Sequence, residues 1–324
     1  MASYPDFEKN PESVALKTWI KSSRHSAANG SLMRTHPLGI MCIGKTLDET
    51  FEIAAKMGRT THIDPRCTVA CCATTGLVRG LLRGEVTSEE EVDAILDQAF
   101  SYVQNNESLR NPGHDDAAIT PVSSEQDRTL LDKNEYEKHL KATHYSDLQL
   151  DDSQKMGYVY KCLASAVLAL RLAMRGKFSK TLLMNERVNL FEETITDLIM
   201  QGGDADTNGC VAGALLGAWL GYSRLPKHWL QGIQNHNWLL WKCEALSRQS
   251  GVGGELLEEL DKATDTGPDG GRGLFSDEEL NDRERGLLEK ILLKQKDRRE
   301  AKEREDKKRS GGGIGGLLKS MKLT

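Results

Sequence analysis

Apolar residues recur at helical spacing along most of the first 250 residues of the chain, and strand-like alternation is rare. One such segment begins at Asp64-Pro65 and ends at Gly84. Its apolar face consists of Val69, Cys72, Ala73, Leu77 and Leu81. Similar periodic segments cover residues 155–175, 189–201 and 229–246. The pattern predicts an all-α fold, arranged as a compact multi-helix bundle.

Helix start signals agree with this periodicity. Thr46 followed by Glu49 has the spacing of a capping box, in which each residue satisfies a free backbone N–H near the other. Ser88 with Glu91 has the same spacing. Asp64 is a favourable residue for a helix N-cap, and proline fits the first helical position that follows it. These signals predict helices that begin close to residues 47, 65 and 89.

The segment from Cys210 to Leu220 is almost entirely apolar, and glycine recurs every four residues around it. These glycines are Gly209, Gly213, Gly217 and Gly221. A membrane-spanning helix needs about 20 apolar residues, so this segment is too short. Each glycine within a helix costs roughly 1 kcal/mol relative to alanine. We therefore expect a buried central helix whose glycines allow neighbouring helices to approach closely.

The composition of the chain changes after residue 250. Residues 251–275 are rich in glycine and aspartate and predict a linker, and residues 276–324 predict a charged C-terminal arm that is either helical or disordered. The first 250 residues would form the helical domain. A short basic cluster at Lys307 to Arg309 is weak evidence for nuclear import.

Charge and cysteine content restrict the function further. The formal net charge of −5 argues against binding of nucleic acid through bulk positive charge. The chain has seven cysteines and no C-x-x-C pair, which favours free thiols in a reducing compartment. The first residues lack the basic and apolar blocks of a signal peptide, and no segment predicts a membrane span. The expected location is cytoplasmic or nuclear.

Three oxygen-bearing side chains lie within four residues at the start of the apolar segment: Asp204, Asp206 and Thr207. Oxygen ligands of this kind bind Mg²⁺, Mn²⁺ or Ca²⁺ rather than zinc. Gly202-Gly203 would supply the turn that lets both carboxylates reach one ion, and the helix N-terminus would favour a phosphate beside it. The alternative is that the aspartates only cap the helix, which explains one of them.

Four stretches together are similar to a known family. "GGDADTNGCVAGALLGAWLG" begins at Gly202, and it resembles the C-terminal signature of the ADP-ribosylglycohydrolases, which are all-helical hydrolases that remove ADP-ribose from proteins or small acceptors. "NGSLMR" begins at Asn29, "THIDPRC" at Thr61 and "LPKHW" at Leu225. The resemblance covers roughly residues 5–241, and the four motifs occur in the order of the family.

The resemblance implies a magnesium-dependent hydrolase. Family members use two Mg²⁺ ions, and half of their ligand set corresponds to Asp204, Asp206 and Thr207. The bond cleaved would be at the anomeric carbon of the ribose distal to adenine, and the partner would be an ADP-ribosylated protein or small-molecule conjugate. Metal ions would share the work that two carboxylic acids perform in ordinary glycosidases. No catalytic acid pair is identified in this sequence.

The resemblance also implies a substrate-binding set. Asn29, Gly30 and Ser31 would lie against the diphosphate and ribose, because glycine lets backbone N–H groups approach phosphate closely. His62 would lie on the substrate side, or be a core histidine that donates to a backbone carbonyl. Arg34 would face phosphate, or pair with an acidic neighbour that holds the loop.

The opening residues of the chain resemble the middle of a family member, so the N-terminal segment that carries further metal ligands is expected to be absent. Asp115 and Asp116 are adjacent aspartates outside the motifs that could replace it, or they form a solvated loop tip. One weakly bound ion would then be expected. Three hypotheses follow: an active hydrolase completed by another segment or a partner chain, a non-catalytic module that binds ADP-ribose, or a truncated fragment of a larger hydrolase.

Overall fold

The computed structural model describes residues 6–114, 130–176, 189–254 and 276–320. Within these ranges the secondary structure is helical, and the only extended pairing is an isolated antiparallel bridge between Ala28 and Tyr158. The predicted all-α fold is therefore confirmed. The chain divides into two units, Met1–Leu257 and Glu258–Thr324.

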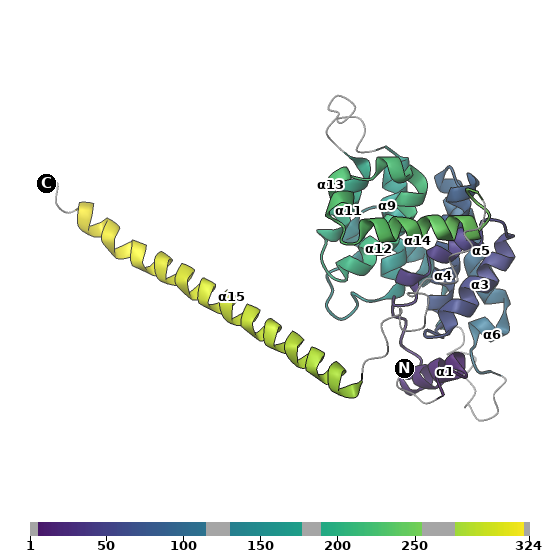
Figure 1. The fold of residues 1–324 in the computed structure, drawn as a ribbon, viewed down its shortest axis with the longest axis horizontal. Helices are drawn as coiled ribbons and strands as arrows, with labels where there is room; N and C mark the ends of the chain where they lie inside the picture. The colour runs from purple at the N-terminus through teal and green to yellow at the C-terminus, as the bar shows by residue number, and fades with distance from the viewer. Residues whose placement is uncertain (1–5, 115–129, 177–188, 255–275, 321–324) are drawn as a thin grey trace. The chain divides into compact units, whose positions relative to one another are not determined.

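The first half of unit 1 is organised around α4 (Pro65–Arg83), which packs against α3 (Leu47–Arg59), α5 (Glu89–Asn105) and α2 (Pro37–Met41). Helix α4 is buried along nearly all of its length. Most of its side chains are small or are thiols, so neighbouring segments can pack closely around it. Figure 1 shows α3, α4 and α5 as neighbours. Two short segments, η1 (Leu32–Arg34) and α6 (Glu107–Arg110), also contact α4, whereas α8 (Lys133–Leu140) and η2 (Tyr145–Leu148) pack against α9 (Val159–Met174).

The second half is organised around α12 (Ala205–Leu220), which packs most extensively against α9 (Val159–Met174) and also contacts α11 (Leu190–Ile199) and α4. These helices group together in Figure 1. The predicted central position of the apolar helix is thus observed. The chain then continues through η3 (Tyr222–Arg224), α13 (Lys227–Gly232) and α14 (His236–Gln249), which bury few side chains.

The predicted reason for the glycines of α12 is only partly right. A Cβ added at Gly209 would lie 3.2 Å from Ile199 Cγ2, so this glycine does permit close packing. A Cβ at Gly213 would make ordinary contacts at 3.8 Å, and a Cβ at Gly217 would have no described atom within 4 Å. Gly221 ends the helix with φ of +80°. Close helix packing therefore does not explain the whole repeat.

The predicted helix starts are confirmed. Thr46 Oγ1 accepts from the backbone N–H of Glu49, whose carboxylate accepts from the backbone N–H of Thr46 at 2.7 Å, and Ser88 and Glu91 form the same box. Asp64 accepts from the backbone N–H of Arg66 at 3.0 Å and caps α4, which has Pro65 at its first position. Local sequence alone determines these contacts.

Helix α1 (Pro11–Lys21) contacts the turn that precedes α4 at two places. Glu12 accepts hydrogen bonds from Arg59, at the last position of α3. Trp19 Nε1 donates to the buried carboxylate of Asp64 at 2.9 Å, and the Trp19 side chain packs in a small cluster with Ile63. Both ends of the segment from residue 59 to residue 64 are therefore held by one helix.

Unit 2 contains α15 (Asp277–Ser320), a long helix with a polar average composition. Residues 115–129, which include Asp115 and Asp116, and residues 255–275, which form most of the predicted linker, lie outside the described residues. No helix in the described part of the chain is long and apolar enough to cross a membrane. All seven cysteines are free thiols, as predicted.

Candidate active site

The first part of the candidate site is the loop that begins at Asn29. It follows directly after the bridge between Ala28 and Tyr158, and the backbone N–H of Asn29 donates to the carbonyl of Gly157 at 3.1 Å. The carbonyl of Ser31 accepts from Thr35 Oγ1 at 2.6 Å. Asn29 is 6% exposed and Ser31 is fully buried. The loop is thus fixed at both ends and covers α4.

The second part is the turn at Gly202-Gly203, which precedes α12. Both glycines have positive φ, +76° and +67°, where other residues are strained. A Cβ at Gly203 would lie 1.9 Å from the carbonyl oxygen of Leu150, so only glycine fits there. The predicted turn is therefore present. It brings the chain to Asp204, the residue immediately before α12.

Asp204 joins the two parts of the site. Its Oδ2 accepts from Asn29 Nδ2 at 2.6 Å, across 175 positions of sequence, and its Oδ1 accepts from Thr207 Oγ1 at 3.1 Å. Asp206 is exposed, and its Oδ1 accepts from the backbone N–H of Thr207 at 2.8 Å, which lowers the pKa of Asp206. The predicted metal-ligand set and the predicted phosphate loop are thus in direct contact.

His62 lies beside Gly30 of the same loop. A Cβ added at Gly30 would be 3.0 Å from His62 Nε2, so the glycine leaves space for the imidazole ring. His62 Nδ1 is 2.8 Å from Thr61 Oγ1, and Arg34 also donates to that hydroxyl. Burial lowers the pKa of His62, and the positive charge of Arg34 lowers it further, against a smaller opposing effect of Asp64. The ring is therefore neutral at neutral pH.

The overall similarity of the chain identifies its family. A sequence model of the ADP-ribosylglycohydrolase family matches residues 6–260. The chain belongs to the ADP-ribosylglycohydrolase family. A protein named as an ADP-ribosyl glycohydrolase in Acanthamoeba polyphaga mimivirus is 36% identical over 58 residues, which are 18% of this chain and 15% of the mimivirus protein.

The geometry bears on the alternatives for individual residues of this family member. Asp204 stands at the N-cap of α12, yet its carboxylate accepts no hydrogen bond from the backbone of that helix among the described residues. Simple capping therefore does not explain it. The Nδ1 atom of His62 pairs with a hydroxyl rather than with a backbone carbonyl. Arg34 is exposed, and no described carboxylate forms an ion pair with it; its described partner is Thr61.

The donor set suits a hard cation only in part. Asp204, Asp206 and Thr207 supply carboxylate and hydroxyl oxygens on one helix N-terminus, which is the chemistry that Mg²⁺ prefers. Within the described ranges, however, no group of three or more histidine, cysteine, aspartate or glutamate side chains is placed to hold a metal ion. The candidate replacement ligands at residues 115 and 116 lie outside the described residues.

A cavity of about 870 Å³ adjoins the loop. Ala28, which belongs to the bridge, and Gly157, whose carbonyl accepts from the backbone N–H of Asn29, form part of its wall. Arg66, Lys155 and Lys161 also line it, and Tyr158 contributes an aromatic ring. Pockets that bind small molecules have about this volume, roughly 300 to 1,000 Å³. The cavity is therefore large enough for a nucleotide-sized group.

Sequence reasoning missed two parts of this site. Gly157 and Tyr158 stand before the apolar helix α9, and their only signal was a glycine beside an aromatic residue at the start of that periodic segment. Thr61, which connects Arg34 to His62, was within a quoted motif but had no predicted role. The roles of all these residues depend on contacts between distant segments.

Proposed function

We propose that this chain is a magnesium-dependent hydrolase that cleaves the glycosidic bond joining ADP-ribose to a protein or small-molecule acceptor. The observation that carries the proposal is the hydrogen bond between Asn29 and Asp204. It joins the loop expected to bind the diphosphate and ribose to the helix N-terminus expected to bind metal. A substrate that contacts both segments would hold its ribose between them.

The residues of the chain would have distinct roles toward that substrate. Gly30 has no side chain, so backbone N–H groups of the loop can approach a diphosphate, which His62 would contact from the other side. A neutral His62 can donate one hydrogen bond and accept another. The exposed guanidinium of Arg34, oriented by Thr61, would add positive charge near the phosphates. The adjoining cavity would take the remaining part of the nucleotide.

Asp204, Asp206 and Thr207 would hold magnesium. Asp206 is the most accessible of the three, whereas Asp204 and Thr207 are already held together by their hydrogen bond. When bound, Mg²⁺ would polarise the ribose hydroxyls and position water for attack at the anomeric carbon. Two carboxylates and a hydroxyl leave several coordination positions for water and substrate, so we expect weak metal binding.

One observation favours a second function, namely binding of ADP-ribose without cleavage. Within the described ranges no third carboxylate joins Asp204 and Asp206. The loop and His62 do not depend on a metal ion for their contacts, since they are held by Gly157, Thr35 and Thr61. The chain would then still bind the diphosphate of ADP-ribose even if it does not hydrolyse the substrate.

Release of free ADP-ribose from a panel of ADP-ribosylated proteins and small conjugates tests the proposal, with Mg²⁺ and then with EDTA. Asp206→Ala should reduce release strongly. Asp48→Ala is a matched control, because Asp48 is also exposed at the second position of a helix, α3, outside the site. Calorimetric titration with ADP-ribose measures binding separately.

The outcomes separate the two functions. Release that requires Mg²⁺ and Asp206, but not Asp48, supports the hydrolase. Binding of ADP-ribose that persists in EDTA and in Asp206→Ala, without any release, supports the binding module. A folded protein that neither releases nor binds ADP-ribose contradicts both.

A further inference from the structure

The first part of α15 carries large aliphatic side chains that its own unit leaves exposed. Leu280 is 47% exposed, Leu287 61% and Ile291 45%. These three residues, together with Glu284 and Lys294, recur at alternating steps of four and three along the helix. That spacing places them on one side, as in the seam of a coiled coil. We call residues 280, 284, 287, 291 and 294 the α15 seam.

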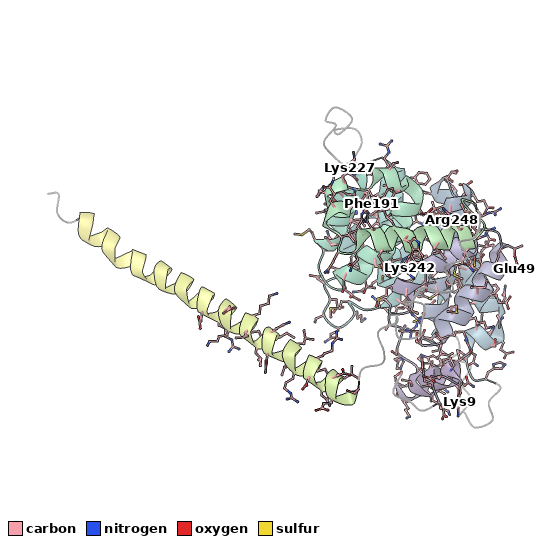
Figure 2. All side chains as sticks on the ribbon, viewed as in Figure 1. Lys9, Glu49, Phe191, Lys227, Lys242 and Arg248 are labelled. Atoms are coloured by element: carbon pink, nitrogen blue, oxygen red, sulfur yellow. The ribbon has the colours of Figure 1, made fainter. Side chains whose placement is uncertain are left out.

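Charge is divided along the same helix. The segment before the central leucines is mainly acidic, and the segment after them is mainly basic. The acidic side chains described before Leu287 are Glu278, Glu279, Asp282 and Glu284, against two arginines, Arg283 and Arg285. The basic ones described after Ile291 are Lys294, Lys296 and Arg299, against Asp297 and Glu300. Figure 2 shows the described side chains of α15 projecting from the helix. The helix is therefore electrostatically complementary to a reversed copy of itself.

We propose that two copies of this chain pair through the α15 seam in antiparallel orientation. In the register that places Leu287 of one copy against Ile291 of the other, Glu284 of each copy faces Lys294 of its partner copy. The apolar pair and the charge pair each form twice, because the arrangement is symmetric. Leu288, which is 60% exposed beside the seam, would meet its own equivalent across the pair.

Parallel pairing fits this helix less well. It would place Glu284 against Glu284 and Lys294 against Lys294, and like charges at a helix interface favour another arrangement. An anionic membrane is a further possible occupant of a helix with leucine and lysine residues. The acidic segment from Glu278 to Glu284 would be repelled by such a surface. A second copy satisfies both charged segments.

Sedimentation equilibrium of the full chain, over a range of concentrations, measures the pairing. The wild-type chain should show a monomer–dimer equilibrium. Leu287→Asp should weaken it by about tenfold or more, because buried leucine contributes on this order to association. Leu293→Asp is the matched control: Leu293 is equally exposed, at 61%, but lies on the opposite side of the helix from the seam.

Charge reversal tests the orientation. In a dimer of Glu284→Lys, lysine faces lysine at both contacts between residues 284 and 294. In a dimer of Lys294→Glu, glutamate faces glutamate at the same two contacts. Each variant should therefore dimerise more weakly than the wild type. A mixture of the two variants should form a heterodimer, because opposite charges again face each other at both contacts between residues 284 and 294. Far-UV circular dichroism establishes that each variant retains its helix content.

Three results would overturn the proposal. The first is a chain that stays monomeric at every concentration, whether or not it binds anionic phosphatidylserine vesicles. The second is equal weakening by Leu287→Asp and Leu293→Asp, which would exclude the seam. The third is a mixture of Glu284→Lys and Lys294→Glu that associates no better than either variant alone, which would exclude the antiparallel register.

Discussion

The turn at Gly202-Gly203 offers a quantitative test of how the site is positioned. Both glycines have positive φ, but only Gly203 lies against another backbone segment. An added Cβ there would be 1.9 Å from Leu150 O and 2.7 Å from Leu150 C, whereas at Gly202 it would be 3.8 Å from Asp151 Cβ. Substitution of each glycine by alanine therefore separates backbone strain from steric overlap.

The expected losses follow from these distances. The left-handed conformation costs alanine about 1–2 kcal/mol, and the reduced entropy of the unfolded chain offsets about 0.4–1 kcal/mol of this loss. Gly202→Ala should thus reduce the free energy of unfolding by about 1 kcal/mol. Gly203→Ala has the same terms plus overpacking against a backbone carbonyl, which typically costs about 1–3 kcal/mol. We expect a total loss of about 2–4 kcal/mol.

Equilibrium urea unfolding, followed by far-UV circular dichroism, measures both variants against the wild type. The turn leads directly into Asp204, so Gly203→Ala should also reduce ADP-ribose binding or release more than Gly202→Ala does. Equal losses of stability in the two variants would show that the chain at Leu150 moves aside easily. The close approach would then have no role in fixing the site.

Three further results are expected. Gly217→Ala should raise the free energy of unfolding by about 0.5–1 kcal/mol, because the helix gains a better former and the added methyl meets no described atom, and a lower Tm would contradict this. The unfolded chain binds a proton at His62 near the ordinary pKa of 6.5, whereas burial lowers the pKa of His62 in the folded chain. The free energy of unfolding therefore falls as the pH drops below 6.5. His62→Gln should lose less stability than the wild type between neutral pH and about pH 5 in urea titrations, and an unchanged pH profile would refute the pKa direction. Asn29→Ala should weaken ADP-ribose binding in calorimetry, since Asp204 loses its partner, and unaltered affinity would show that this contact is dispensable.

The parts of the fold that depend on local sequence were predictable. Thr46 and Ser88 cap helices through residues three positions away, and Asp64 caps α4 through its neighbour Arg66. Apolar periodicity identified α4 and α9 because each buries residues at helical spacing. Residues of the candidate site were found because short motifs resembled a family. Neither kind of signal requires knowledge of distant contacts.

The contacts between segments could not be predicted in the same way. The bond from Asn29 to Asp204 spans 175 positions, and nothing local indicates that the Asp204 carboxylate turns away from its own helix. The glycine repeat of α12 suggested close packing throughout, yet Gly217 has space around it because packing depends on what lies opposite. Pairing of the bridge that contains Ala28 likewise depends on a strand-like residue far along the chain, Tyr158.

The two contacts of α1 have a consequence for how genetic data on this chain should be interpreted. Trp19 and Glu12 hold Asp64 and Arg59, which bracket the turn with His62. In a mutational scan, substitutions of Trp19 and Glu12 in α1 should therefore reduce function about as much as substitutions in the candidate site. A tolerant opening segment would be the usual expectation near a chain terminus. Here the loss of Trp19 would act on the turn with His62 through Asp64.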